Sequence, residues 1–383
     1  MQPFFFQIVP EIHYGPGAAA KVGSVLQRFG ARHAMVVTDP GVLAAGVCNT
    51  VLESLAAAGI RHTLFHDVAT NPCDTHVMAA VAAFGEAGAD CLVGVGGGSP
   101  MDVAKSAAAV IGNGGHIREY EDGGHSTANP GPPLVFVPTT AGTGSEVVGG
   151  TIIVDTSRPF KMHIVAVPGK AAFCDPLLTL SLPPAVTAAT GLDALSHAIG
   201  AYVSADRQPL ADAYALYAIE QIRHWLMPAV ENGADLEARS AMMVASLTAG
   251  ISMKGGGSGE HAFAHGVNAL HNVHHGVACA LFLADVMEFN LPHVPERYAR
   301  IAEALGVPAA GRNAVEHGRA GIAAVRDLVE RAGIPTFAQL GVSKGQIPGL
   351  VDYAMQDAFH LGLNPVPITV EDAERILTIT LAA

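Results

Sequence analysis

The first half of the chain alternates short apolar runs with longer segments whose apolar residues recur at helical spacing. The apolar runs, at residues 33–38, 63–65, 91–95 and 134–137, predict buried strands. Helical spacing after the first three runs predicts helices over 47–58, over 75–84 and up to residue 111. Strands that alternate with helices indicate a parallel, doubly wound sheet with ligand sites at the carboxyl ends of its strands.

The second half lacks a convincing strand pattern and reads as helical. Prolines at 176, 183 and 184 interrupt the chain, and helices are predicted over 211–227 (ending at Pro228), 236–253, 277–290 and 297–305. We therefore predict an α/β domain over residues 1–180 and an all-helical domain over residues 181–383.

Composition narrows the class of protein. Half of the 383 residues are apolar and only 14% are charged, which is typical of a densely buried globular protein. A net charge of −13 argues against nucleic-acid and anionic-membrane partners, and no apolar run approaches a transmembrane length. The apolar run at residues 4–6 follows no basic residue, so a secretory signal is not expected. Five scattered cysteines without a C-x-x-C pair suit reduced thiols in the cytoplasm.

Three stretches at predicted strand ends have unusual chemistry. Asp39 can accept hydrogen bonds from a ribose diol and would repel a ribose phosphate, although a turn residue before Pro40 is the alternative. Residues 96–102, Gly-Gly-Gly-Ser-Pro-Met-Asp, open a helix as phosphate cradles do, without the G-x-G-x-x-G fingerprint. Residues 138–146, rich in Thr and Gly, can bind phosphate or ribose, or form an ordinary loop. Together they indicate a nucleotide site.

Acidic and imidazole side chains recur at helical spacing in the second half. Asp193 and His197 are four residues apart, as are His261 and His265, and His275 follows. One such pair is more often an ordinary helix face, but two pairs and a further histidine favour a divalent metal site. Asp and His ligands suit both Fe²⁺ and Zn²⁺.

These motifs, in this order, resemble the iron-containing (group III) alcohol dehydrogenase family over nearly the whole chain. The motifs that carry the resemblance are Gly96-Gly-Gly-Ser-x-x-Asp102, Pro138-Thr-Thr-Ala-Gly-Thr-Gly-Ser-Glu146, Asp175-Pro176, Gly191-Leu-Asp-Ala-Leu-Ser-His197, His261-x-x-x-His265 and His275-Gly276. The resemblance implies an N-terminal dinucleotide-binding α/β domain and an all-helical metal-binding domain, an architecture shared with dehydroquinate synthase. It also leads us to expect a homodimer or higher homo-oligomer.

The resemblance assigns roles residue by residue. The metal ligands would be Asp193, His197, His261 and His275, with Fe²⁺ expected and Zn²⁺ as the alternative. His265 would be catalytic and could relay a proton. The NAD(H) contacts would be Asp39, Asn71, Gly97, Gly98, Ser99, Asp102, Thr139, Thr140, Thr143 and Lys161.

Some positions depart from the family pattern. Gly200 stands where the family usually has Glu, and Val148 stands where it has a hydroxyl residue. The approach to His261 is also changed, and its glycines at 255–257 would leave room for a bulkier substrate. Lys254 could attract an anionic group on that substrate, or could simply close a helix. Further candidate substrate contacts are Phe263 and His271.

The expected reaction is metal-assisted hydride transfer between NAD(H) and a small alcohol or aldehyde, which could be an anionic semialdehyde. Two alternatives are a lyase resembling dehydroquinate synthase, which would need a cluster of basic residues, and a non-catalytic metal-binding protein. With only 21 Lys and Arg residues in the chain, the first is disfavoured. The second leaves the glycine-rich loop and Asp39 unexplained.

Overall fold

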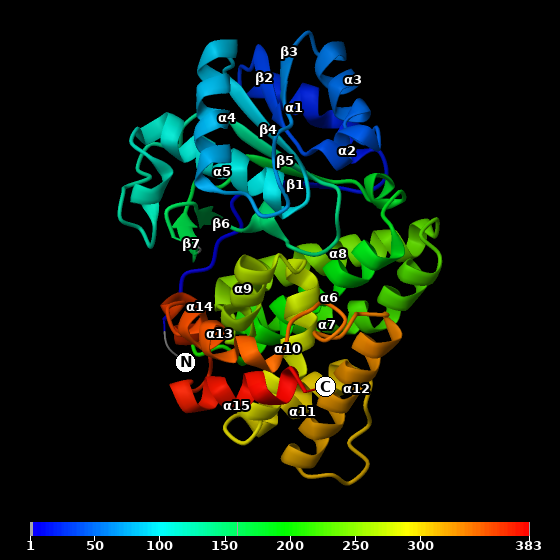
Figure 1. Ribbon diagram of the computed structural model, residues 1–383. Coiled ribbons are helices and arrows are strands. Elements are labelled where there is room, and N and C mark those ends of the chain that lie inside the picture. Colours follow the sequence, from blue (N-terminus) through cyan, green and yellow to red (C-terminus); the bar gives the residue numbers. More distant parts are fainter. Residues whose placement is uncertain (1–2, 159, 383) are drawn as a thin grey trace. The chain divides into compact units, whose positions relative to one another are not determined.

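The chain folds as two units, each with its own core (Figure 1). The computed structural model describes residues 3–158 and 160–382. One unit spans Gln7–Ser181, and the other runs from Leu182 onward together with the stretch up to Phe6. The ring of Phe6 stacks on Tyr214 with centroids 6.1 Å apart, so this N-terminal stretch packs against the second unit.

A six-stranded parallel sheet forms the centre of the first unit. Its strand order is β1-β8-β5-β4-β2-β3. The strands are β1 (Glu11–Tyr14), β2 (His33–Val37), β3 (Arg61–Phe65), β4 (Cys91–Gly96), β5 (Leu134–Pro138) and β8 (Ala171–Cys174). Every residue of β2, β4 and β5 is buried, as expected when helices cover both faces of a parallel sheet.

Helices cover the two faces of this sheet and make two separate cores. They are α1 (Val22–Arg28), α2 (Pro40–Ala44), α3 (Asn49–Ala57), α4 (Asp74–Ala87) and α5 (Gly98–Asn113). Leu92 of β4 lies in the core that includes residues of α4 and α5, whereas its neighbour Val93 lies in the core with residues of α1 and α3. The predicted doubly wound α/β fold is confirmed.

Four strands of this unit escaped the sequence analysis. β1 and β8 have only four residues each, too few to show a period. The other two form the antiparallel hairpin β6 (Gly150–Asp155) and β7 (Phe160–Val165), whose buried positions include polar Thr151 and Lys161. Polar side chains at buried positions hide the apolar alternation that identifies a strand.

The second unit is helical, and its described residues contain no strand. Its helices are α6 (Pro184–Val203), α7 (Pro209–Glu231), α8 (Leu236–Ser252), α9 (Glu260–His271), α10 (His275–Asn290), α11 (Pro295–Ala304), α12 (Ala314–Arg331), α13 (Ile347–Ala354), α14 (Ala358–Leu363) and α15 (Val370–Thr380). α6 is buried on all sides from Thr187 to Val203 and packs against α7, α8 and α10. A helix that is apolar all round belongs at the centre of a bundle.

One predicted helix end is wrong. α7 continues through Pro228 to Glu231. Proline removes one intrahelical hydrogen bond, but only one turn follows Pro228, so the loss is confined to the end of the helix. Among the described residues, no helix combines the length and apolar character that crossing a bilayer requires.

Candidate functional site

The end of β4 bends sharply into the N-terminus of α5. Gly96 has φ of 147°, and a Cβ there would lie 2.7 Å from Pro100 Cγ, so only glycine fits. Gly97 follows as the N-cap of α5 without a side-chain cap, which leaves the first backbone N–H groups of the helix for other acceptors. This arrangement suits a phosphate.

The Thr-rich loop after β5 lies against these glycines. A Cβ on Gly97 would meet Thr140 Oγ1 at 3.4 Å, and a Cβ on Gly98 would meet Thr143 Cγ2 at 3.1 Å. The Thr140 hydroxyl oxygen is buried and has no hydrogen-bond partner among the described residues. Since buried polar groups are normally hydrogen-bonded, a ligand in this cradle would satisfy it. The residues present therefore fit a dinucleotide phosphate.

Two of the predicted NAD(H) contacts have structural partners of their own. Asp102 Oδ1 accepts from the Ser145 hydroxyl at 2.6 Å, and its Oδ2 accepts from the Ile152 backbone N–H at 3.1 Å. The Ser99 hydroxyl donates to the Thr70 carbonyl at 2.6 Å. Asp102 thus ties α5 to the Thr-rich loop and to β6, a role that it can fulfil without touching the cofactor.

The remaining predicted contacts come from several elements of the same unit. Asp39 follows β2 and caps α2, accepting from the Val42 N–H at 2.9 Å. Thr139 is buried and its N–H donates to the Gly96 carbonyl at 2.9 Å, while Asn71 lies between β3 and α4 and Lys161 is a buried residue of β7. The turn-residue interpretation of Asp39 is therefore correct for its Oδ1, which caps α2.

The second unit brings the predicted metal ligands together. Asp193 and His197 share one face of α6, with Asp193 Oδ1 3.8 Å from His197 Nε2 and 3.6 Å from Nε2 of His275 on α10. The ring of His261 on α9 stacks on His197 with centroids 4.9 Å apart and lies 5.5 Å from the ring of His275.

Buried atoms in this cluster lack a hydrogen-bond partner among the described residues. Asp193 Oδ1 and His261 Nε2 are buried and form no hydrogen bond within residues 3–158 and 160–382. A buried carboxylate oxygen and an imidazole nitrogen, surrounded by further imidazoles, are the donor set that Fe²⁺ and Zn²⁺ prefer. The residues present therefore fit a divalent metal ion.

The sequence analysis missed a thiol beside these residues. Cys279 lies one turn after His275 on α10, and its Sγ is 3.5 Å from His275 Nε2. Donor atoms of Cys279, Asp193, His261 and His275 lie within 4.8 Å of one another. Burial raises the pKa of the Cys279 thiol to about 11, so without a metal it is a neutral packing residue. The H-x-x-x-C spacing was the available signal.

His265 is paired through its Nδ1 with the carboxylate of Asp357. Its Nδ1 lies 3.1 Å from Asp357 Oδ2, and Nδ1 of His360 lies 2.9 Å from both Asp357 oxygens. Burial alone would raise the pKa of Asp357, but the two imidazoles outweigh burial and hold it well below its usual range. The ring of His265 lies 5.3 Å from that of His275, so this group adjoins the metal-binding cluster. The sequence analysis missed Asp357 and His360, whose D-x-x-H spacing was the only sign.

The three predicted substrate contacts have different surroundings in the structure. Phe263 is 1% exposed and packs against Phe282, so it is a core residue rather than a substrate contact. His271 ends α9 and lies 3.3 Å from the Gln346 side chain. Lys254 belongs to a short 3-10 helix, Met253–Gly255, and its carbonyl accepts from Gln208.

Most of the glycines before His261 do not leave room for a substrate. A Cβ on Gly255 would lie 2.7 Å from Ala211 Cβ, and a Cβ on Gly256 would lie 2.2 Å from Ser204 Oγ. A Cβ on Gly259 would lie 2.6 Å from Ile368 Cδ1. A Cβ on Gly257 would make only an ordinary contact, 3.8 Å from Leu363 Cδ1. The expectation of extra space is therefore wrong for Gly255 and Gly256, which permit close packing with the neighbouring chain.

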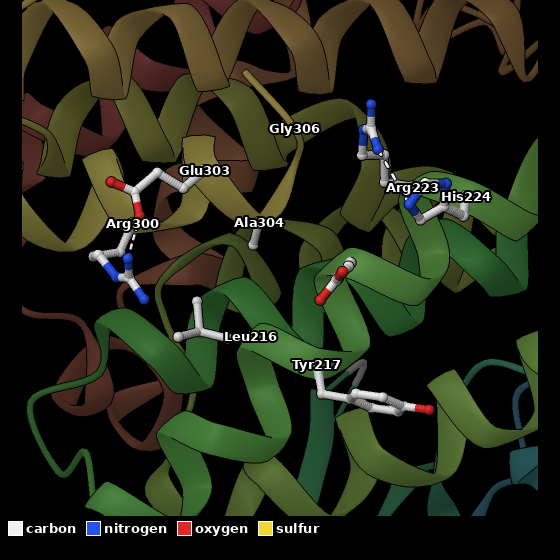
Figure 2. A pocket seen from close by; sticks show the side chains of 9 residues that line it. Leu216, Tyr217, Arg223, His224, Arg300, Glu303, Ala304 and Gly306 are labelled. Carbon is white, nitrogen blue, oxygen red and sulfur yellow. Dashed lines mark hydrogen bonds and ion pairs between the residues drawn. The ribbon is translucent and has the colours of Figure 1, made fainter. Parts of the chain in front are cut away.

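A cavity of about 420 Å³ lies elsewhere in this unit, between α7 and α11 (Figure 2). Charged side chains line it, among them Arg223 and the ion pair of Arg300 and Glu303. None of the predicted site residues lines this cavity, so it is separate from the chemistry described above.

Two family models match the chain over most of its length. The model of iron-containing alcohol dehydrogenase matches residues 10–176, and the model of the Fe-containing alcohol dehydrogenase family, C-terminal, matches residues 187–381. This match favours a dehydrogenase over the lyase and over a non-catalytic protein.

Individual relatives and a solved structure are similar to this chain over nearly its whole length. The NAD-dependent methanol dehydrogenase of Bacillus methanolicus is 37% identical over 376 residues, covering 97% of this chain and 98% of that protein. The 4-hydroxybutyrate dehydrogenase of Cupriavidus necator is 35% identical over 387 residues, covering 97% and 98%. A crystal structure of 1,3-propanediol oxidoreductase has a TM-score of 0.95 and 36% identity, covering 99% of this chain and 100% of that one. The predicted fold and enzyme class are thus confirmed: the chain belongs to the iron-containing alcohol dehydrogenase family.

Proposed function

We propose that Asp193, His197, His261 and His275 hold one divalent metal ion. The observation that carries this proposal is that Asp193 Oδ1 and His261 Nε2 are buried without a geometric hydrogen bond inside a cluster of imidazoles. The contacts of 3.6 and 3.8 Å from Asp193 Oδ1 to two imidazole nitrogens support one shared ion, because ligands of one ion lie about that far apart. Fe²⁺ is expected from the family, and Zn²⁺ suits the same donors.

The reaction is hydride transfer between NAD(H) and a small alcohol or aldehyde. The metal, when bound, lowers the pKa of an alcohol group or polarises an aldehyde carbonyl. The cradle of Gly97, Gly98 and Thr140 would hold the cofactor phosphates against the N-terminus of α5. Asp39 would accept hydrogen bonds from the adenosine ribose and select NAD(H) over NADP(H).

His265 would move the proton that the reaction releases or takes up. Because Nδ1 of His265 donates to the Asp357 carboxylate, Nε2 is the ring atom that can accept or give a proton. His360 lies on the same carboxylate, so a second imidazole can exchange protons beside the first. Asp357 would keep His265 in this tautomer and stabilise its protonated form.

A panel of aldehydes tests the proposed activity. Purified protein is incubated with NADH and each aldehyde, and loss of the reduced nicotinamide absorbance is followed. Turnover with short aldehydes is expected, and the His261→Ala protein is expected to have none. Absence of NADH oxidation with every aldehyde, in protein shown to contain metal, would contradict the proposal.

The substrate itself is proposed to be small, and Lys254 provides a test for charge. Relatives named for methanol and for 4-hydroxybutyrate differ in having a neutral and a carboxylated substrate. If Lys254 attracts an anion, a short ω-acid semialdehyde should outperform the neutral aldehyde of equal length, and Lys254→Met should erase the advantage mainly by raising KM. Equal kcat/KM for propanal and its carboxylated analogue in the unmutated protein would leave a small neutral alcohol as the substrate.

A homo-oligomer in the cytoplasm is also proposed. β1 and β3 are the edge strands of the sheet, and exposed edges are a common route by which two copies pair. All five cysteines are unpaired, which suits a reducing compartment. Light scattering coupled to gel filtration would measure the oligomeric state, and a monomer at micromolar concentration would contradict the proposal.

A further inference from the structure

A buried carboxylate stands directly behind His261. Glu260 begins α9 and is completely buried. Its Oε1 lies 3.0 Å from His261 Nδ1, and its Oε2 accepts from the Ser258 hydroxyl. Burying an ionised carboxylate is costly, so one that persists in a core needs donors such as these two.

Helix α6 leaves the space that this carboxylate occupies. Gly200 lies three residues after His197, and a Cβ there would be 3.1 Å from both Glu260 Oε1 and Ser258 Oγ. Any side chain at position 200 would therefore compete with the Glu260 carboxylate for the same volume. In the sequence, Gly200 indicates the loss of an acid from α6. In the structure, the missing side chain of Gly200 leaves the space in which α9 places the acid Glu260.

We propose that Glu260 is a positioning residue for the metal centre, acting through His261. By accepting from Nδ1–H, it fixes the tautomer of His261 in which Nε2 carries no proton. That same Nε2 is buried and makes no geometric hydrogen bond among the described residues. The inference rests on the proposed function, since it requires His261 to be a metal ligand.

The carboxylate also makes His261 a better ligand. An imidazole whose second nitrogen donates to a carboxylate is more basic and is held in one orientation, and removal of such a partner typically lowers metal affinity about 10- to 100-fold. Ser258 contributes by holding the other carboxylate oxygen, which stops Glu260 from rotating away from His261.

Three variants test this role. Glu260→Met has a similar length and no acceptor, Glu260→Gln keeps an acceptor oxygen without the charge, and Asp285→Asn is the matched control. Asp285 is likewise a buried acid of this unit, and its partners Arg326 and the Thr380 hydroxyl are not proposed ligands. The measurement is the Zn²⁺ affinity of apo protein by competition with a chelator, alongside the unfolding midpoint of each apo variant.

Glu260→Met is expected to weaken Zn²⁺ binding about 10- to 100-fold, and Glu260→Gln by less, because it retains the acceptor. Asp285→Asn is expected to lower the unfolding midpoint without changing the affinity. A Glu260→Met protein that binds Zn²⁺ within about twofold of the unmutated protein would overturn the proposal, since about tenfold is the least that loss of such a partner produces.

Two further measurements keep the test decisive. If Glu260→Met does not fold, the Zn²⁺ affinity of Glu260→Gln decides, because this variant lacks the charge that makes His261 a more basic ligand. A weakened affinity supports the role, and an unchanged affinity overturns it. His261→Ala tests the ligand assignment separately from the role of Glu260. If this variant binds Zn²⁺ as tightly as the unmutated protein, the ligand assignment itself fails. If His261→Ala loses Zn²⁺ and Glu260→Met does not, only the role of Glu260 fails.

Discussion

A cation between Asp193 and His261 would account for the buried atoms of both side chains that make no hydrogen bond. A buried polar atom left without a hydrogen bond costs about 1–3 kcal/mol. Asp193 Oδ1 and His261 Nε2 are both atoms of this kind. A single divalent ion would satisfy both and would draw in the imidazoles of His197 and His275. The evidence for a metal site therefore comes from buried atoms without hydrogen bonds, and no single sequence motif provides it.

Removal of the His265 imidazole should separate metal binding from catalysis. His265→Ala is expected to keep the metal while kcat falls about 10²- to 10⁴-fold, because general acid–base groups typically contribute that much. Asp357→Asn should keep the metal and lose less rate, since it weakens the hold on His265 without removing the imidazole. Metal analysis and steady-state kinetics on the same samples check this prediction. Full turnover of His265→Ala would exclude the proton relay.

Asp39 should decide between the two nicotinamide cofactors. An ionised carboxylate about 4 Å from a 2′-phosphate would be repelled by roughly 4 kcal/mol before screening at an effective dielectric constant of about 20. Asp39→Gly and Asp39→Asn should both relax the preference for NAD(H), and the Asn variant retains a side chain that can cap α2. The measurement is kcat/KM with each cofactor. Equal values for the unmutated enzyme would contradict the assignment.

At the scale of elements, α5 is joined to the Thr-rich loop by buried charge. Lys105, fully buried on α5, donates to the Ser145 carbonyl at 3.0 Å and to the Ser145 hydroxyl at 2.7 Å. Asp102 binds the same hydroxyl, so both residues fix the loop whose threonines face the glycine cradle. These contacts position the loop before any cofactor binds.

Glu146, at the end of that loop, should make stability depend on pH. Burial raises its pKa from 4.5 to about 7, and the nearby Lys105 limits the rise. The folded state therefore binds the proton more tightly than the unfolded state, so this contribution is complete below about pH 4.5 and is lost as pH rises through about 7. The shift corresponds to at most about 3 kcal/mol of unfolding free energy.

Glu146→Gln removes this titration and is the direct test. Denaturant unfolding at pH 5 and pH 8 should show that the Gln variant loses less stability over this interval than the unmutated protein. Since all other groups titrate in both proteins, the difference between the two pH dependences isolates Glu146. Identical pH dependences would mean that the glutamate is ionised in the folded state at both values.

The elements that could be predicted were those whose burial is regular. β2, β4 and β5 are buried throughout and appear as apolar runs. The Asp193/His197 pair on α6 and the His261/His265 pair on α9 appear as helical spacings. The strands that could not be predicted are short or carry polar residues at buried positions. Glu260 and Asp357 were missed for different reasons. Glu260 adjoins His261 in the sequence, but only the fold places it against Gly200 in a buried site. Asp357 is 92 residues from its partner His265.

In the whole molecule, the candidate site residues are divided between two compact units. The glycine cradle and Asp39 belong to the unit of Gln7–Ser181, and the imidazole cluster belongs to the helical unit. Each group is supported by its own core, which is why the cradle and the cluster can be described separately. We expect the reaction to require both groups, because the two halves of the chain match models of one enzyme family.

The metal content of the purified protein tests the central claim most directly. Protein purified without chelator, and its Asp193→Ala, His197→Ala, His261→Ala and His275→Ala variants, are analysed for Fe and Zn by elemental mass spectrometry, with His265→Ala as the control. We predict one metal ion per chain in the unmutated protein and in the control, and loss of metal together with turnover in each of the four ligand variants. A His261→Ala protein that retained full metal content and turnover would contradict the account.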